Sequence, residues 1–120
     1  MSLIDDYLQA ARSRFERVAP EELDEAMSAG ALVVDIRPEV NRREEGELPG
    51  AVVIDRNVLE WRLAPSSEFR VVDVEPGQPV VLVCNEGYQS SLAAATLIDL
   101  GLDGATDLIG GYRAWKIQQG

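Results

Sequence analysis

The chain has 120 residues with a formal net charge of −10, no histidine and a single cysteine, Cys84. These counts exclude a histidine general base, a Ser/His/Asp or Cys/His triad, a histidine-containing zinc site and a disulfide within the chain. Catalysis by this protein would therefore use carboxylates or the Cys84 thiol, and we expect neither a resident metal nor a cofactor.

Length and charge also limit the architecture and the partners. A chain of this length is expected to form one domain with its own core. The excess of acidic residues repels nucleic acid and anionic lipid, so neither is an expected partner. The first six residues carry acids where a signal peptide needs basic residues, and the longest apolar run, residues 79–84, is too short to cross a bilayer. We therefore expect a cytoplasmic protein.

The first predicted element is a helix that begins at Ser2, a residue suited to capping it. Its acids precede its arginines, as the helix dipole prefers. We assign residues 1–16 to an N-terminal helical extension and residues 17–120 to the main domain. A stripe at helical spacing is suited to packing on this domain or to forming a homodimer; it consists of Ile4, Leu8, Ala11 and Phe15.

Helix and strand signals alternate along the rest of the chain. A second helix is expected over residues 20–28, ending at Gly30. Four apolar runs have strand length: residues 31–34, 51–54, 80–83 and 105–109. The remaining helices are a short one capped by Asn57, a longer one over residues 91–100, and a last one through Tyr112 and Trp115.

This alternation predicts an α/β domain with a central, mostly parallel sheet and helices on both faces. Because the apolar runs are unbroken, we expect each strand to be covered on both faces. Ligands of such sheets bind just beyond the carboxyl ends of the strands. Two polar clusters fall at such ends: Asp35 with Arg37 after the first strand, and a loop that begins at Cys84 after the third.

The Cys84 loop combines a strand end, a glycine and a helix start. This arrangement aims backbone N–H groups at the cysteine sulfur and stabilises an anion there. We therefore interpret Cys84 as a reactive thiol rather than as a small buried hydrophobe. Glu86 opposes an anion and is expected to point outward. Tyr88 is expected to be exposed beside the sulfur, where it could help to recognise a partner.

The other polar and aromatic candidates favour structural roles. A carboxylate and a guanidinium that follow a strand often pair to fix a loop, so we expect pairing of Asp35 with Arg37 in preference to direct catalysis. Trp61 and Trp115 are expected in the core or in helix packing.

Several spaced motifs together resemble a rhodanese domain. Residues 81–91 (VLVCNEGYQSS) and 108–115 (LIGGYRAW) resemble its carboxyl half. Residues 33–37 (VVDIR) and 46–51 (GELPGA) resemble its amino half. The motifs occur in the right order, so together they are far more specific than any one of them. The resemblance extends over about residues 17–118.

The resemblance implies a rhodanese-like fold and sulfurtransferase activity. In this family a cysteine thiolate takes a sulfane sulfur from a donor, holds it as a persulfide and passes it to an acceptor such as cyanide, a thiol or another protein. By position, Cys84 is the nucleophile, and Asp35 and Arg37 match a supporting Asp-x-Arg motif. The implied partners are a sulfur donor and an acceptor, either a small thiol or a protein. The rest of the loop forms the implied substrate cradle: Asn85, Glu86, Gly87, Tyr88, Gln89 and Ser90.

Departures from the family pattern bear on the sulfur donor. A histidine that is frequent in the 46–51 stretch is Glu47 here, and the loop lacks the basic residues that often stand beside the cysteine and at Gln89. Thiosulfate is a dianion, so a loop with one acid and no base attracts it poorly. We expect weak thiosulfate turnover and a neutral or protein-borne donor, with Arg37 as the one cation near enough to compensate.

Two other functions stay open. Phosphatases and arsenate reductases of this fold place an arginine six residues after the cysteine, where it clamps the oxyanion, but that residue here is Ser90. Arg37 or Arg113 could approach from elsewhere in the chain. Alternatively, the domain is a non-catalytic binding module, or a redox sensor that uses Cys84.

Overall fold

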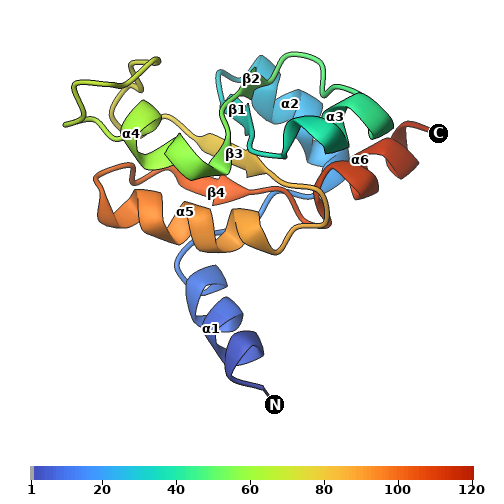
Figure 1. Cartoon of the computed structure of the whole chain (residues 1–120), viewed down its shortest axis with the longest axis horizontal. Coiled ribbons are helices and arrows are strands. Elements are labelled where there is room, and N and C mark those ends of the chain that lie inside the picture. Colours follow the sequence, from blue (N-terminus) through green and yellow to red (C-terminus); the bar gives the residue numbers. More distant parts are fainter. Residues whose placement is uncertain (1) are drawn as a thin grey trace.

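The computed structural model describes residues 2–120 as a layered α/β structure (Figure 1). Within these residues, no helix is both long and apolar enough to span a membrane. The elements are, in chain order, α1 Leu3–Arg12, η1 Pro20–Glu22, α2 Leu23–Ser28, β1 Leu32–Asp35, α3 Glu39–Glu45, β2 Val52–Val53, η2 Arg56–Val58, α4 Leu59–Leu63, β3 Val80–Val83, α5 Gln89–Asp99, β4 Ala105–Asp107 and α6 Gly111–Gln119.

The four strands form one parallel sheet in the order β2-β1-β3-β4, which confirms the predicted sheet. All four residues of the central strand β3 are buried, as an unbroken apolar run predicts. The prediction that each strand is covered on both faces is wrong for β2. This two-residue edge strand pairs with β1 alone, and its Val53 is 46% exposed.

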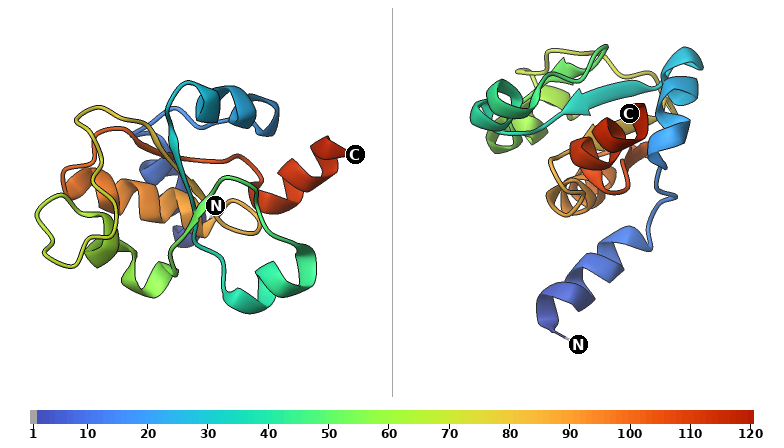
Figure 2. Two further views of the ribbon diagram at one scale, coloured as in Figure 1. Left: turned by 90° about the horizontal axis from the view of Figure 1, so that it is seen from above. Right: turned by 90° about the vertical axis from the view of Figure 1, so that its right-hand side faces the viewer.

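Alternate residues of the central strands face opposite helix layers. Val34 and Leu82 join the core under α4 and α5, whereas Val33 and Val81 join the core under α2 and α6. Seen from above, α2 lies on one side of the strands and α4 on the other (Figure 2, left). Trp115 packs against the second core, as predicted. The predicted arrangement of helices on both faces is therefore present.

Helix α1 begins where the sequence predicts, because Ser2 Oγ accepts a hydrogen bond from the Asp5 N–H at 3.1 Å. The helix ends at Arg12 and does not continue to Phe15. The reason lies in the tertiary structure, since the chain beyond the helix turns to pair Val18 with the residue that follows β4. Two of the arginines that follow the acids in the sequence, Arg14 and Arg17, consequently lie outside the helix.

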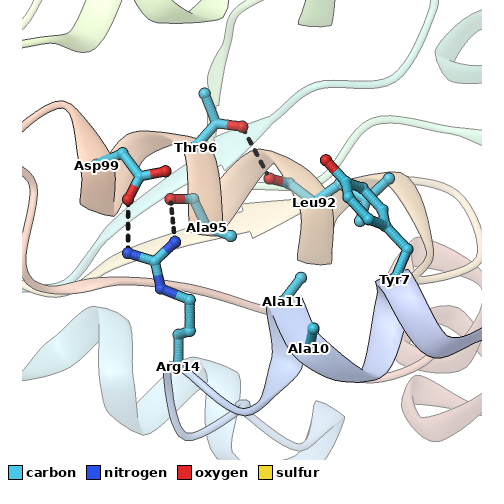
Figure 3. A pocket seen from close by; sticks show the side chains of 8 residues that line it. All are labelled: Tyr7, Ala10, Ala11, Arg14, Leu92, Ala95, Thr96 and Asp99. Carbon is cyan, nitrogen blue, oxygen red and sulfur yellow. Dashed lines mark hydrogen bonds and ion pairs between the residues drawn. The ribbon is translucent and has the colours of Figure 1, made fainter.

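Helix α1 packs against α5, and its N-terminal end projects from the body of the protein (Figures 1 and 2). Ala11 is buried in this contact, whereas Ile4 at the other end of the apolar stripe is 63% exposed. Arg14, which follows α1, donates to Asp99 Oδ1 of α5 at 2.6 Å (Figure 3). Both residues line a pocket of about 200 Å³ between the two helices. The stripe thus packs on its own domain at one end, and the homodimer stays a prediction.

Three local features differ from the prediction. Helix α3 was not predicted and has no apolar periodicity in the sequence, because Val40 is the only apolar residue among its seven. Asp55, not Asn57, caps the turn before α4, since Asp55 Oδ1 accepts the Asn57 N–H at 2.8 Å. Trp61 is 56% exposed instead of lying in the core. It sits in the middle of α4, whose two terminal leucines occupy the buried face.

Candidate functional site

Three strands deliver buried polar residues to one edge of the sheet, where parallel sheets bind ligands. β1 ends in Asp35, β3 ends one residue before Cys84, and β4 ends in Asp107. The side chains of all three residues are buried. The sequence singled out Asp35 and Cys84 as candidates but placed Asp107 inside a longer strand and assigned it no role.

The loop after β3 curls around the Cys84 sulfur. The Gly87 nitrogen lies 3.1 Å from Sγ and the Ser90 nitrogen 3.4 Å from it, with both N–H groups donating. Sγ also lies 3.2 Å from Ser90 Oγ. Helix α5 begins at Gln89, two residues earlier than predicted, so Ser90 belongs to its first turn. Loop and helix therefore both present amides to this sulfur, which is an arrangement that stabilises an anion.

Two glycines allow this close approach of the backbone. Gly87 has φ of +89°, and a Cβ at this position would lie 2.8 Å from the Gly110 nitrogen. A Cβ on Gly111 would lie 2.5 Å from the Cys84 carbonyl oxygen. The same carbonyl accepts the Tyr112 N–H at 2.8 Å. The turn before α6 thus fixes the backbone that carries the thiol.

Glu86 and Tyr88 are exposed, as the sequence predicts. Glu86 Oε2 lies 3.3 Å from Arg113 Nη1, so its charge has a partner on α6. Tyr88 is 61% exposed and borders a pocket that α1 also lines with Ile4 and Leu8. The surface beside the loop therefore carries the Glu86–Arg113 ion pair and an apolar strip formed by Ile4, Leu8 and Tyr88.

Asn85 and Gln89 are held by residues from other elements. Asn85 Nδ2 donates to Glu45 of α3 at 3.1 Å, and Arg56 Nε donates to Gln89 Oε1 at 3.1 Å. Arg113 Nε also donates to Glu45, at 3.0 Å. These hydrogen bonds, first from Arg113 and then from Asn85, lower the pKa of Glu45 to about 2. An ionised carboxylate therefore braces the start of the loop.

The Asp35–Arg37 pair is buried, and its two charges face each other. Arg37 Nη2 lies 2.7 Å from Asp35 Oδ2, and Arg37 Nε lies 3.0 Å from Oδ1. Nη2 also donates to the Gly46 carbonyl at 2.9 Å, and the guanidinium lies 3.8 Å from the centre of the Tyr112 ring. The predicted pairing is confirmed. The idea that Arg37 compensates the acidic loop is wrong, because its charge is directed at Asp35 and shielded from solvent.

Two arginines that the sequence did not connect with the loop contact it from the N-terminal segment. Arg12 Nη2 and Arg17 Nη2 donate to the Gly87 carbonyl at 2.8 Å and 3.1 Å. Arg12 Nε donates to Ser91 Oγ at 2.9 Å. Burial, and then the neighbouring Arg17 charge, lower the pKa of Arg12 from its ordinary value. The N-terminal segment therefore holds the Gly87 carbonyl of the loop by two hydrogen bonds.

Asp107 accepts hydrogen bonds from the N-terminal segment and from the first turn of α5. Arg17 Nε donates to Asp107 Oδ1 at 2.8 Å, and Arg17 Nη2 donates to Oδ2 at 3.1 Å. The hydroxyls of Ser90 and Ser91 each donate to Oδ2 at 2.7 Å. One sequence signal could have found this residue, because an acid within a buried strand requires partners. The partners themselves lie far away in sequence or on another element, so the pattern could not name them.

The arrangement suits a thiol that acts in turn as a nucleophile and a leaving group. Its sulfur faces backbone N–H groups, and the chain contains no imidazole that could serve as a base. Within residues 2–120, no group of three or more acidic or thiol side chains is arranged to hold a metal ion.

Comparison with known proteins identifies the family. Residues 19–118 match the family model for the rhodanese-like domain. Among curated relatives, the chain is 31% identical over 105 residues to the thiosulfate sulfurtransferase GlpE of Pseudomonas fluorescens (strain SBW25), and the match covers 87% of each chain.

Solved structures share this fold. Protein RPA3614 of Rhodopseudomonas palustris CGA009, described as of unknown function and a possible tyrosine phosphatase, aligns with a TM-score of 0.84 at 28% identity, over 100% of this chain and 93% of its own. The human single-domain sulfurtransferase TSTD1 aligns with a TM-score of 0.70 at 26% identity, over 87% of this chain and 97% of its own. The similarity to RPA3614 includes the segment that contains α1.

Proposed function

The chain belongs to the rhodanese-like domain family, and on this premise we propose that it is a single-domain sulfurtransferase that carries sulfane sulfur as a persulfide on Cys84. The relatives named as sulfurtransferases support the activity. One observation carries the assignment to Cys84: the sulfur of the chain's single thiol accepts hydrogen bonds from the Gly87 and Ser90 N–H groups.

The reaction we propose has two displacement steps. The Cys84 thiolate attacks the outer sulfur of the donor, so that a new S–S bond forms to Cys84 while the donor's own bond to that sulfur breaks. The electron pair of the broken bond leaves with the donor remainder, which is sulfite when the donor is thiosulfate. An acceptor thiolate or cyanide then attacks the outer sulfur, and Cys84 leaves as a thiolate. No net oxidation occurs, so no cofactor is required.

The loop residues have separate roles in this proposal. The backbone of residues 85–90 forms the cradle for the transferred sulfur, and the exposed side chains, including Glu86 and Tyr88, meet the donor or acceptor. Asp35 and Arg37 support the edge of the sheet as a buried pair. We assign this activity to residues 17–120 and treat residues 1–16 as an extension.

We propose a neutral or protein-borne persulfide as the preferred donor. The net charge of −10 disfavours the approach of a dianion. Arg113 partly neutralises Glu86, while Arg12 and Arg17 are directed at the Gly87 carbonyl and at Asp107 or Ser91. The charges of these three arginines are therefore directed at groups of the protein itself. Thiosulfate should therefore load Cys84 at least about ten-fold more slowly than a small persulfide does.

Intact-mass measurement tests the proposal directly. The full chain is incubated with thiosulfate or with cysteine persulfide, and it should gain one sulfur atom that cyanide removes. Cys84→Ser should abolish the gain. A matched control, Cys84→Ser combined with Ser66→Cys, places a thiol on an exposed loop without the amide cradle. It should not retain cyanide-labile sulfur.

Two results would overturn the assignment. Failure of every sulfur donor to load a Cys84 that iodoacetamide still alkylates would favour the binding module or redox sensor. Hydrolysis of an aryl phosphate that depends on Cys84 would favour a phosphatase, the activity suggested for RPA3614.

A further inference from the structure

The Asp107 carboxylate lies one side chain away from the Cys84 sulfur. It is fully buried and accepts four hydrogen bonds, two from Arg17 and one from each of the hydroxyls of Ser90 and Ser91. Of these donors, Ser90 also touches the sulfur, with Oγ 3.2 Å from Sγ. The chain of contacts therefore runs from Asp107 through Ser90 to Cys84.

The Ser90 hydroxyl has a single proton to donate. Its oxygen lies 2.7 Å from Asp107 Oδ2, a carboxylate that attracts the proton more strongly than a neutral thiol does. The proton therefore points at Asp107, and the lone pairs of Ser90 Oγ are left for the sulfur. In this orientation Ser90 can accept a hydrogen bond from the Cys84 S–H, but it cannot donate one to a thiolate.

We propose that Asp107 is a positioning residue that acts through Ser90 to keep the unloaded Cys84 protonated. The Gly87 and Ser90 N–H groups favour the thiolate, whereas the Ser90 hydroxyl, held by Asp107, favours the thiol. The balance between them restrains the free thiol from alkylation and oxidation. This inference rests on the proposed function only for its biological use, since the geometry concerns the free thiol alone.

Sulfur loading removes this restraint. In a persulfide, the Cys84 Sγ is bonded to the outer sulfur and carries no proton and no full negative charge. The orientation of the Ser90 hydroxyl then no longer opposes an anion on Sγ. Asp107 therefore restrains the thiol of the empty enzyme, whereas it does not act on the resting persulfide until Cys84 leaves as a thiolate.

The surrounding charges are fixed by other contacts. Arg17 pairs with Asp107, and Arg12 contacts Ser91 and the Gly87 carbonyl. Glu86, the acid within the loop, is exposed and pairs with Arg113. Ser91 offers a matched control for Ser90, because its hydroxyl donates to the same carboxylate oxygen at 2.7 Å and accepts from Arg12 Nε. Its oxygen lies 3.4 Å from the Gly87 carbonyl and has no hydrogen bond to the sulfur among residues 2–120.

The test measures the rate at which iodoacetamide alkylates Cys84 at a series of pH values from neutral to alkaline. Intact-mass measurement reports the extent of alkylation. Ser90→Ala should raise the alkylation rate at neutral pH by about three- to ten-fold, because the acceptor of the S–H bond is lost. The rise should come from a shift of the profile to lower pH, with the alkaline plateau unchanged. Better access of the reagent would instead raise the plateau. Ser91→Ala should stay within about two-fold of the wild type.

A double-mutant cycle tests whether Asp107 acts through Ser90. Asp107→Asn should shift the profile to lower pH in the wild-type background and much less in the Ser90→Ala background. An equal shift in both backgrounds would show a direct effect of charge and overturn the proposal. Slower alkylation of Ser90→Ala would also overturn it, since the hydroxyl would then donate to the thiolate. If Asp107→Asn does not fold, the comparison of Ser90→Ala with Ser91→Ala decides the question. Sulfur donors are absent from this assay, so failure of the proposed sulfur transfer would leave its outcome unaffected.

Discussion

Two Asp–Arg pairs with buried carboxylates stand at the same edge of the sheet, and they differ in what else they contact. Asp35 and Arg37 lie two residues apart, and their charges lie 2.7 Å apart with almost no exposure. Asp107 pairs with Arg17, which lies 90 residues away in sequence and is partly exposed. Only the second pair belongs to a hydrogen-bonded chain that reaches the Cys84 sulfur.

The difference shows that burial and charge do not by themselves mark a functional residue. Arg37 uses its remaining contacts on the Gly46 carbonyl and the Tyr112 ring, which hold the end of α3 against α6. Asp107 is contacted by two serine hydroxyls at the start of the helix that follows the Cys84 loop. The first pair therefore supports the fold, and the second is in a position to influence the sulfur.

The largest predicted effect comes from breaking the first pair. Asp35→Asn leaves the Arg37 charge buried without a counter-ion, which should lower the free energy of unfolding by about 3–5 kcal/mol in urea titrations. The exposed ion pair of Arg14 with Asp99 provides the control, and Asp99→Asn should move the urea midpoint little. The protein that remains folded after Asp35→Asn should keep the wild-type pH profile of Cys84 alkylation. A shift of that profile would remove the distinction between the two pairs.

A smaller effect is predicted at Gly87, on the loop that the second pair supports. Gly87→Ala forces a side chain into positive φ and against the Gly110 nitrogen, which should cost about 2–4 kcal/mol. Gly77 also has positive φ, but a Cβ there would meet nothing within 4 Å among residues 2–120, so Gly77→Ala should cost only about 1 kcal/mol. Urea titration measures both costs. Equal costs would mean that the close approach of the loop to the turn before α6 contributes nothing to stability.

The smallest effect concerns the brace on the outside of the loop and depends on pH. The pKa of Glu45 falls to about 2 in the folded protein from an ordinary value of 4.5, so its contribution to stability is present above about pH 4.5 and is lost as the pH falls towards 2. At neutral pH the wild type should therefore unfold at a higher urea concentration than Glu45→Gln does. This difference in urea midpoint should shrink as the pH falls from 4.5 towards 2. In an Arg113→Gln background the difference at neutral pH should be smaller. A difference that is independent of pH would show that hydrogen bonding by the side chain, and not its charge, braces the loop.

The fold was largely predictable because its signals are local. The unbroken valine and leucine run of β3 and the turn that precedes it identified the central strand, and the position of Cys84 at its end identified the edge of the sheet. Helix α3 was missed because a short, charged helix has no apolar periodicity, and Trp61 was misplaced because α4 buries only the leucines at its two ends. In α3 and α4, contacts with the rest of the protein decide the structure more than the local spacing of apolar residues does.

The sequence by itself determined the thiol, its place after a parallel strand, and the glycine that lets the loop close around it. Each of these depends on residue type and spacing within about a dozen positions. Only the tertiary structure decided which charges reach the sulfur. It directed Arg37 to Asp35, and it joined Arg17 to Asp107 across most of the chain. The physical reason is that a buried charge must find partners in three dimensions, and the partners are chosen by where the strands and helices pack, not by distance along the chain.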